Sequence, residues 1–318
     1  MTRDELIAEL SRWPVSCVDL LTVLQRGTAE VLYAGGGAVA LRDACGTVLF
    51  WAGPKGRENE AAARAALPFL PKGALYAVHG ELCARLVKEA FGCGDEIEPC
   101  LQARYLGALP PAPPPGVAIR PLGPEHEAIV WQHYHTVADE EYVRGRLAAG
   151  VVLGAFLAPQ AGAPQPAGPL PKTPPCEGSG LPACGNGEQP AGQGEEQPGS
   201  QGEKQPAGQG EEHPASQGGE QPASQGEKQP GSQDEKQAGE SLAGFVGLHG
   251  EGGIGMLEVF PQYRRRGLAE ALMRGIMRQQ MEQGLAPFGH IVAGNEPSIR
   301  LQTKLGFSFA EELVYWME

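Results

Sequence analysis

The chain has 318 residues, of which 41% are hydrophobic, and a formal net charge of −13. It is long enough for two ordinary domains together with a segment that does not fold. Acidic residues interrupt the apolar residues of the first ten positions, and no stretch of about 18 apolar residues follows. The sequence therefore predicts neither a secreted nor a membrane-bound protein, and we expect a cytoplasmic location.

Seven cysteines are spread along the chain without any Cys-x-x-Cys pair, the spacing that zinc and redox sites usually need. Their number is odd, which also argues against a framework of disulfides. We expect free thiols in a reducing compartment and no metal site.

Residues 1–110 have the pattern of a compact α/β unit. Helical spacing over residues 4–10 and 17–27, with Gly27 as the stop, precedes three short apolar runs in residues 29–53 that predict a strand meander. A charged helix near residues 58–66, a strand at 74–80, a helix at 81–92 and a strand near 96–105 follow. The glycines at 35–37 lack the Gly-x-Gly-x-x-Gly spacing of a nucleotide loop and favour a turn. A proline-rich linker at residues 111–116 ends this unit.

A second unit is predicted over residues 117–318. It starts with a strand at residues 117–122, two segments of helical spacing at 124–137 and 139–150, and a strand at 151–158. After a long tract, strands are expected at residues 242–250 and 254–260.

The tract at residues 159–240 has hardly any aromatic or β-branched residue and repeats an octapeptide of the type QGEKQPGS from Gln193 onward. It offers too little apolar surface to offset the entropy of ordering, so we predict a disordered insert. Residues 160–240 hold twelve acidic residues and four lysines, so −8 of the net charge of −13 belongs to the insert. Because strand patterns continue on both sides, its expected place is the tip of a hairpin. Lengthening a turn to this size costs only about 2–3 kcal/mol of closure entropy.

The stretch from Phe260 to Met277, FPQYRRRGLAEALMRGIM, sets three arginines and a glycine between an apolar strand and an amphipathic helix. A helix start exposes unpaired N–H groups and the positive end of the helix dipole, and Gly267 would let a ligand approach the backbone. Arginines beside such a nest favour a phosphate-bearing ligand. A solvated basic cluster and a nucleic-acid patch are the alternatives, but the aromatic residues and broad positive face of a nucleic-acid binder are missing.

These residues resemble motif A of the GNAT superfamily of N-acyltransferases, in which Arg264, Gly267 and Ala269 fill the pattern Gln or Arg, two residues, Gly, one residue, Gly or Ala. A second motif follows in GNEPSIRLQTKLGF, where Asn295 and Ser298 match the family's later signature. The amino-acid sequence of this stretch looks most like the bacterial branch related to glycine N-acyltransferase. The resemblance covers residues 117–318 without the insert and implies a GNAT fold, a mixed and mostly antiparallel sheet with flanking helices.

The resemblance implies that acetyl-CoA is the cosubstrate. It places the pantetheine arm against the backbone at Val259, and Asn295 near the thioester, where the two central strands splay apart. Ser298 is a further implied cofactor-binding residue. The pyrophosphate falls on the amides of the loop, whose implied binding residues are Arg264, Arg265, Arg266, Gly267, Leu268 and Ala269. Asn295 also precedes a helical segment with Pro297 in its first turn, so it is equally an N-cap.

The sequence departs from the family at the acid and the base. The position of the basic Glu of several relatives holds Gly253, and the position of the acidic Tyr holds Gln302. We therefore predict Glu258, a carboxylate within an apolar strand, and His249 as the catalytic candidates, with Glu251 nearby. His133 and His135 are expected on a helix surface, although that helix borders the acceptor cleft in the family.

Two classes of function remain open. The first is an acyl-CoA-dependent N-acyltransferase, acting as a monomer or homodimer on a small amine or amino acid, without nucleic acid or membrane partners. The second is a degenerate transferase that holds coenzyme A without turnover, or a scaffold whose partner is the repeat tract. The missing Glu and Tyr favour the second class, and the intact phosphate loop favours the first.

Overall fold

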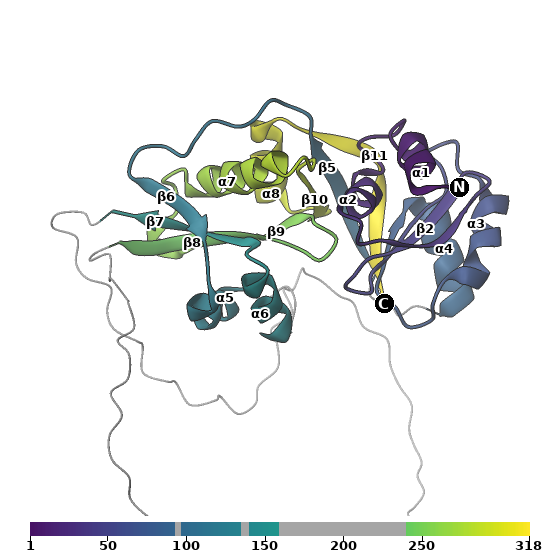
Figure 1. The fold of residues 1–318 in the computed structure, drawn as a ribbon, viewed down its shortest axis with the longest axis horizontal. Helices are drawn as coiled ribbons and strands as arrows, with labels where there is room; N and C mark the ends of the chain where they lie inside the picture. Colours follow the sequence, from purple (N-terminus) through teal and green to yellow (C-terminus); the bar gives the residue numbers. More distant parts are fainter. Residues whose placement is uncertain (93–96, 135–139, 159–239) are drawn as a thin grey trace, which may run out of the picture. The chain divides into compact units, whose positions relative to one another are not determined.

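The computed structural model describes residues 1–92, 97–134, 140–158 and 240–318. The described residues form a seven-stranded sheet with the order β1-β2-β3-β4-β11-β5-β10 and a four-stranded sheet with the order β6-β7-β8-β9 (Figure 1). All strand pairs in these ranges are antiparallel except β3 with β4. The predicted fold class, a mixed and mostly antiparallel α/β fold with flanking helices, is confirmed. The predicted insert at 159–240 lies outside the described residues except for Glu240.

The first part of the chain packs helices on both faces of its strands. Because successive strand residues face opposite sides, Val39, Leu41 and Leu49 contact α1 and α2 whereas Ala40 and Phe50 contact α3 and α4. The elements are α1 (Arg3–Leu10), α2 (Val18–Arg26), β1 (Glu30–Gly35), β2 (Ala38–Arg42), β3 (Val48–Trp51), α3 (Glu60–Ala66), β4 (Tyr76–His79), α4 (Gly80–Phe91) and β5 (Glu98–Tyr105).

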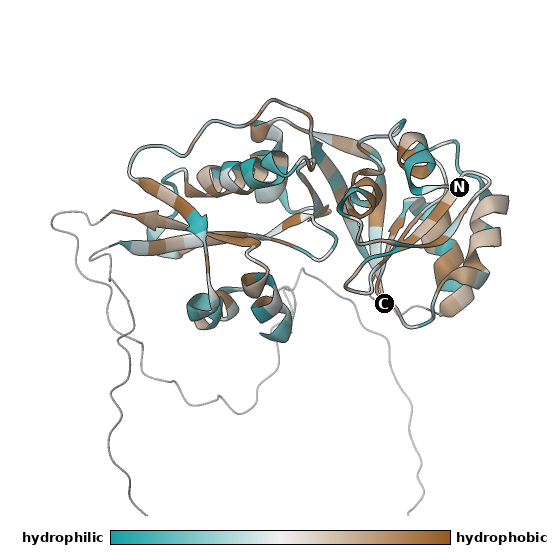
Figure 2. Cartoon of the chain, in the orientation of Figure 1, coloured by the Kyte–Doolittle hydropathy of each residue, from teal (hydrophilic) through white to brown (hydrophobic). Residues whose placement is uncertain are grey.

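The later part is arranged in the same way, with α7 and α8 above the four-stranded sheet and α5 and α6 below it in Figure 1. Hydrophilic and hydrophobic residues share α7 in Figure 2, and its buried stripe includes Leu272, Ile276 and Met277. The elements are β6 (Val117–Pro121), α5 (Glu127–His133), α6 (Glu140–Ala148), β7 (Val152–Leu157), β8 (Ser241–Leu248), β9 (Ile254–Val259), α7 (Leu268–Glu282), β10 (Phe288–Val292), α8 (Glu296–Leu305) and β11 (Phe307–Met317).

The two parts repeat one order of elements and exchange their last strands. Three antiparallel strands, a helix, a strand, a helix and a strand run from β1 to β5 and again from β7 to β11. However, β5 pairs with β10, and β11 lies between β4 and β5. The seven-stranded sheet therefore takes strands from both sides of the proline-rich stretch.

The strands next to the insert are paired as expected of a hairpin. In the ladder of β7 and β8, Leu157 lies opposite Ser241 and Val152 lies opposite Gly247. The residues between Leu157 and Ser241 therefore join the ends of two antiparallel neighbours, which confirms the predicted pairing.

The two repeats differ in whether their third strand pairs with their fourth strand. In the first repeat β3 pairs with β4, whereas β9 and β10 belong to different sheets. A bulge also interrupts β9, because Gly247 pairs with Gly255 and Phe245 with Glu258, which leaves Met256 and Leu257 opposite a single residue. Met256 takes a positive φ of 51° there. The separation of β9 from β10 leaves room for a cavity.

No helix in the described parts of the chain is long and apolar enough to cross a membrane. The four cysteines within these parts, Cys17, Cys45, Cys83 and Cys100, are free thiols, as predicted. Cys93, Cys176 and Cys184 lie outside them.

Candidate functional site

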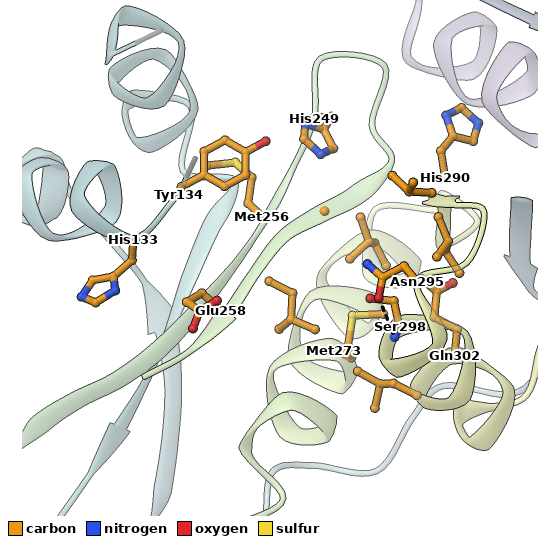
Figure 3. A pocket seen from close by; sticks show the side chains of 16 residues that line it. His133, Tyr134, His249, Met256, Glu258, Met273, His290, Asn295, Ser298 and Gln302 are labelled. Carbon is orange, nitrogen blue, oxygen red and sulfur yellow. Dashed lines mark hydrogen bonds between the residues drawn. The ribbon is translucent and has the colours of Figure 1, made fainter. Parts of the chain in front are cut away.

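A cavity of about 510 Å³ lies between β9 and β10 and extends to α8. Strand β9 contributes the whole run from Ile254 to Glu258, the region of the bulge. Figure 3 shows Tyr134, His249 and Met256 on one side of this cavity and Asn295, Ser298 and Gln302 on the other. Other residues of its lining are His133, Met273, His290, Ile291, Val292 and Leu301.

His249 lies at the end of β8 with its ring against Gly255. A Cβ atom on Gly255 would come within 2.0 Å of the His249 Nε2 atom, so only glycine leaves space for this ring. On the other side of the ring, Nδ1 lies 2.9 Å from the hydroxyl of Tyr142. Burial and the charge of Arg146 lower the pKa of His249 to about 4, so the imidazole is neutral at pH 7.

The tautomer of His249 decides its chemistry. If Nδ1–H donates to the Tyr142 oxygen, Nε2 carries a free lone pair at the cavity and can accept a proton. Burial raises the pKa of Tyr142 well above its ordinary value, so its hydroxyl stays neutral. A neutral Tyr142 hydroxyl can accept from Nδ1–H or donate to Nδ1, and the first arrangement is the one that leaves the Nε2 lone pair free.

Glu258 also lines the cavity and connects it with the arginine loop. Its Oε1 atom lies 3.0 Å from the guanidinium of Arg264, whose Nε donates to the carbonyl oxygen of Val259 at 2.9 Å. The side chain is 29% exposed and therefore remains accessible to a ligand. The structure thus brings Glu258, His249, Asn295 and Ser298 together, whereas Val259 and the loop residues do not line this cavity.

The loop before α7 presents backbone donors that nothing else uses. Within the described residues, no acceptor is found for the N–H groups of residues 265–269, and no side chain caps the helix. Arg265 and Gly267 have positive φ values of 62° and 76°, which favour a concave nest of N–H groups. A Cβ on Gly267 would meet nothing within 4 Å, so the approach to the nest is open.

The other predicted loop residues have different surroundings. Arg265 and Arg266 are exposed, and the guanidinium of Arg266 lies over the ring of Tyr263 at 5.7 Å. Leu268 is buried in the core, and Ala269 is half-buried. The donor geometry and the two exposed cations fit a pyrophosphate group.

Asn295 has the predicted capping role, because its side chain accepts from the Ser298 amide at 3.3 Å at the start of α8. One turn further along, Gln302 is buried at the cavity wall, and its Oε1 atom has no hydrogen-bond partner among the described residues. Its amide can donate a hydrogen bond into the cavity but, unlike a tyrosine, has no proton to give up.

A carboxylate does lie next to Gly253, although it belongs to another residue. The Glu251 Oε1 atom would be 2.6 Å from a Cβ on Gly253. Burial, followed by the effects of Asp43 and Asp19, raises the pKa of Glu251 to about 8. Glu251 is therefore largely protonated at pH 7, and it does not line the cavity.

The helix α5 contributes residues that the sequence pattern placed elsewhere or missed. His133 lines the cavity and packs on Phe260 at a ring distance of 4.4 Å rather than lying free on the helix surface. His135 falls outside the described residues. Tyr134 and Tyr142 were not predicted, because nothing in the local pattern links them to His249. The only signal was Gly255, a glycine inside a strand, which often marks a close approach.

Comparisons with known proteins find structures that are similar at low identity, including one with a TM-score above 0.5. A structure of a Drosophila protein is 16% identical, with a TM-score of 0.58, over 99% of this chain and 94% of that chain. A GCN5-related N-acetyltransferase from Kribbella flavida is 12% identical, with a TM-score of 0.44, over 96% and 94% of the two chains. A GCN5-related N-acetyltransferase-like protein from Streptococcus suis is 11% identical, with a TM-score of 0.45, over the full length of both. No curated protein matches the sequence. A family model does match it: residues 232–317, from just before β8 to the end of β11, are similar to the family described as FR47-like protein.

Proposed function

We propose that the protein is an acyl-CoA-dependent N-acyltransferase that moves an acetyl group from acetyl-CoA to the amine of a small molecule or amino acid. One observation carries this proposal. A nest of unused N–H donors leads, through the ion pair of Arg264 with Glu258, to a cavity between separated strands. The match of residues 232–317 and the two sequence motifs support the same conclusion.

The amides of residues 265–269, with Arg265 and Arg266, would hold the pyrophosphate. The bound cosubstrate supplies a thioester that an amine can attack directly. The acyl carbon then gains a C–N bond and loses its C–S bond, and the amine gives up one proton. The protein must therefore accept a proton and stabilise an oxyanion.

We assign the proton acceptor to Nε2 of His249. Its ring is neutral above about pH 5, because its pKa lies near 4, and the contact with Tyr142 can hold the proton on Nδ1. Glu258, which also pairs with Arg264, is better suited to bind the ammonium form of the acceptor. This form first loses one proton to water, and the neutral amine then attacks and gives the second proton to His249. His133, which also lines the cavity, can add a second contact to the acceptor.

The bulge at Met256 and Leu257 supports oxyanion stabilisation. A bulge leaves a residue outside the strand ladder, and both bulge residues line the cavity, so an N–H group at this point is our candidate donor to the oxyanion. Across the cavity, the amide of Gln302 can donate to a leaving thiolate, which then takes its proton from water.

A protein that binds coenzyme A without turnover is the second candidate, because Gln302 stands where the family's acid is expected. The two functions separate in one assay. The protein is mixed with acetyl-CoA and a panel of amines and amino acids, and free thiol is followed while calorimetry measures coenzyme binding. Thiol release that depends on an amine supports the transferase. Binding without release supports the second candidate, and absence of binding at millimolar coenzyme would contradict both.

A further inference from the structure

A second cavity, of about 390 Å³, lies in the first part of the fold and has no role in the proposed acyl transfer. Three segments line it: Arg12–Ser16 between α1 and α2, Pro54–Arg57 after β3, and Phe309–Glu312 in β11. We call it the bulge cavity. It includes the loop that follows the carboxyl end of β3, one strand of the parallel pair β3–β4, and open α/β sheets usually bind ligands at the carboxyl ends of their strands.

A large bulge in β11 forms the floor of this cavity. Phe309 pairs with Ala103 and Leu313 pairs with Leu101, so the three residues from Ala310 to Glu312 lie opposite Gln102 alone. The bulge interrupts the ladder between two central strands. Bulges of this kind often redirect a side chain next to a functional site.

The redirected side chain is Glu312. It is only 6% exposed, and its Oε1 atom has no hydrogen-bond partner within the described residues. A buried acceptor without a partner is costly, and a carboxylate oxygen more so. The charge of Glu312 does act on His79, whose pKa it helps to raise, but the buried Oε1 atom is left without a donor.

The rim of the bulge cavity carries cations beside one exposed carboxylate, that of Glu311. Arg57 and Lys55 are exposed and have no carboxylate partner among the described residues, whereas Arg12 pairs with Glu9. Lys55 reaches only the backbone carbonyl of Glu311, at 3.4 Å. Trp13 and Phe309, both half-buried, supply aromatic surface between the rim and the floor.

This arrangement selects among charged ligands. A polyphosphate would meet the rim cations but also the buried carboxylate, and a simple amine would satisfy Glu312 but be repelled by the rim. A ligand with an ammonium group, an acidic group and an apolar part satisfies all three regions. We propose that the bulge cavity is a second ligand site that binds a free α-amino acid with an apolar side chain.

In this site the ammonium group donates to Glu312, the carboxylate binds Lys55 and Arg57, and the side chain packs between Trp13 and Phe309. The probes are L-phenylalanine, N-acetyl-L-phenylalanine, which lacks the ammonium, and 2-phenylethylamine, which lacks the carboxylate. Calorimetry on the full chain should show binding of L-phenylalanine and at least about tenfold weaker binding of the other two, since each has lost a charge-assisted contact.

The variants locate the site. Glu312→Gln keeps the shape of the side chain and should weaken L-phenylalanine binding by about tenfold or more, without changing coenzyme binding. Because a buried substitution can disturb folding, the exposed pair Lys55→Gln and Arg57→Gln gives an independent test with the same expected loss. Lys72→Gln, an exposed lysine away from every described cavity, is the matched control and should bind as wild type does.

Two results would overturn the proposal. One is an absence of L-phenylalanine binding to the wild-type chain at millimolar concentration. The other is binding that persists in Glu312→Gln and in the Lys55 and Arg57 variants but is lost in Glu258→Gln, because the amino acid would then occupy the first cavity. The first result leaves the proposed acyl transfer untouched, and the second would support acceptor binding at Glu258, so failure of this proposal and failure of the proposed function remain distinguishable.

Discussion

His249 and Glu258 lie on opposite sides of the bulge in β9, and their surroundings assign them different tasks. The His249 ring fills the space left by Gly255 and is held by Tyr142, whereas Glu258 is shared with an exposed arginine side chain. A proton acceptor benefits from a fixed orientation, and an ammonium anchor benefits from an accessible carboxylate. Substituting His249 should therefore change the rate of transfer, and substituting Glu258 should change the affinity for the acceptor.

We expect His249→Ala to lower kcat by about 100-fold or more with little change in coenzyme affinity, because the proton acceptor is lost. Steady-state kinetics with the best amine acceptor measures this. Added imidazole should restore part of the rate, since the substitution leaves a cavity beside Gly255. A variant within about threefold of the wild-type rate would rule out His249 as the base.

Glu258→Gln should instead raise the KM of the amine acceptor while kcat stays within about threefold, because the amide keeps the shape but loses the charge that attracts an ammonium group. The same assay over a range of acceptor concentrations measures the two constants. If kcat falls by about 100-fold and the acceptor KM holds, Glu258 is the base and His249 is not.

Glu251 gives a prediction about stability and pH. Its pKa is about 8 in the folded protein and 4.5 in the reference state, so the folded state binds the extra proton between these values. The stabilisation of the folded state by this proton is complete below pH 4.5 and is lost as the pH rises toward 8. The free energy of unfolding changes by about 1.4 kcal/mol for each pKa unit as an upper limit. Glu251→Gln should match wild type near pH 4 and exceed its unfolding free energy at pH 9. Chemical denaturation at both values tests this, and equal stabilities at pH 9 would contradict it.

At the scale of elements, the loop before α7 offers a matched pair of glycines. Gly267 and Gly284 flank the same helix and share a φ of 76°, and a Cβ added at either position would meet nothing within 4 Å. Substitution by alanine at either position should lower the free energy of unfolding by a similar amount, of order 1 kcal/mol, through backbone strain. Only Gly267 belongs to the proposed nest.

Acetyl-CoA at about 100 times its dissociation constant should stabilise the wild type by roughly 2.7 kcal/mol. Gly267→Val should abolish this gain, because a branched side chain both strains the loop and covers its donors, and Gly267→Ala should reduce it. Gly284→Ala should retain the full gain. Denaturation curves with and without coenzyme measure the difference, and an equal gain in the Gly267 and Gly284 variants would show that the nest does not bind coenzyme.

Local patterns predicted most of these elements, because each depends on neighbouring residues. The run from Ile254 to Val259 forms β9, α7 starts after Gly267, and Asn295 caps α8. The bulge in β9 was not predicted, since a bulge arises from the pairing of two strands and not from one strand's alternation. The partnership of Tyr142 with His249 spans 107 residues and depends on tertiary packing alone.

At the scale of the whole molecule, the exchange of β5 and β11 could not be read from the sequence. Residues 1–110 and 117–318 each carry a complete local pattern, and nothing in either shows that its last strand pairs with the other. We expect residues 117–318 expressed alone to fail to form a cooperatively folding protein, because β10 and β11 lose the strand between them. Far- and near-ultraviolet circular dichroism with thermal unfolding tests this. A soluble fragment with a sharp transition would contradict it.

The insert should behave in the opposite way. Leu157 and Ser241 are already neighbours across the β7–β8 ladder, so an Asp-Gly turn in place of residues 160–240 should leave stability and coenzyme affinity nearly unchanged. The shortened chain is compared with wild type by denaturation and calorimetry. Loss of solubility or of coenzyme binding would show that these residues contribute to the fold.

The position of β5 also determines when the protein can finish folding during its synthesis. The strand ends at Tyr105, but its neighbours β10 and β11 begin about 180 and about 200 residues later, at Phe288 and Phe307. At roughly 5–20 residues per second, a ribosome needs about 10–40 s to supply them. Throughout that interval both edges of β5 lack their partners in the nascent chain, which makes this strand a target for chaperones and for aggregation. Each octapeptide added to the insert lengthens the delay, so the repeat number sets the time for which the newborn protein remains incomplete.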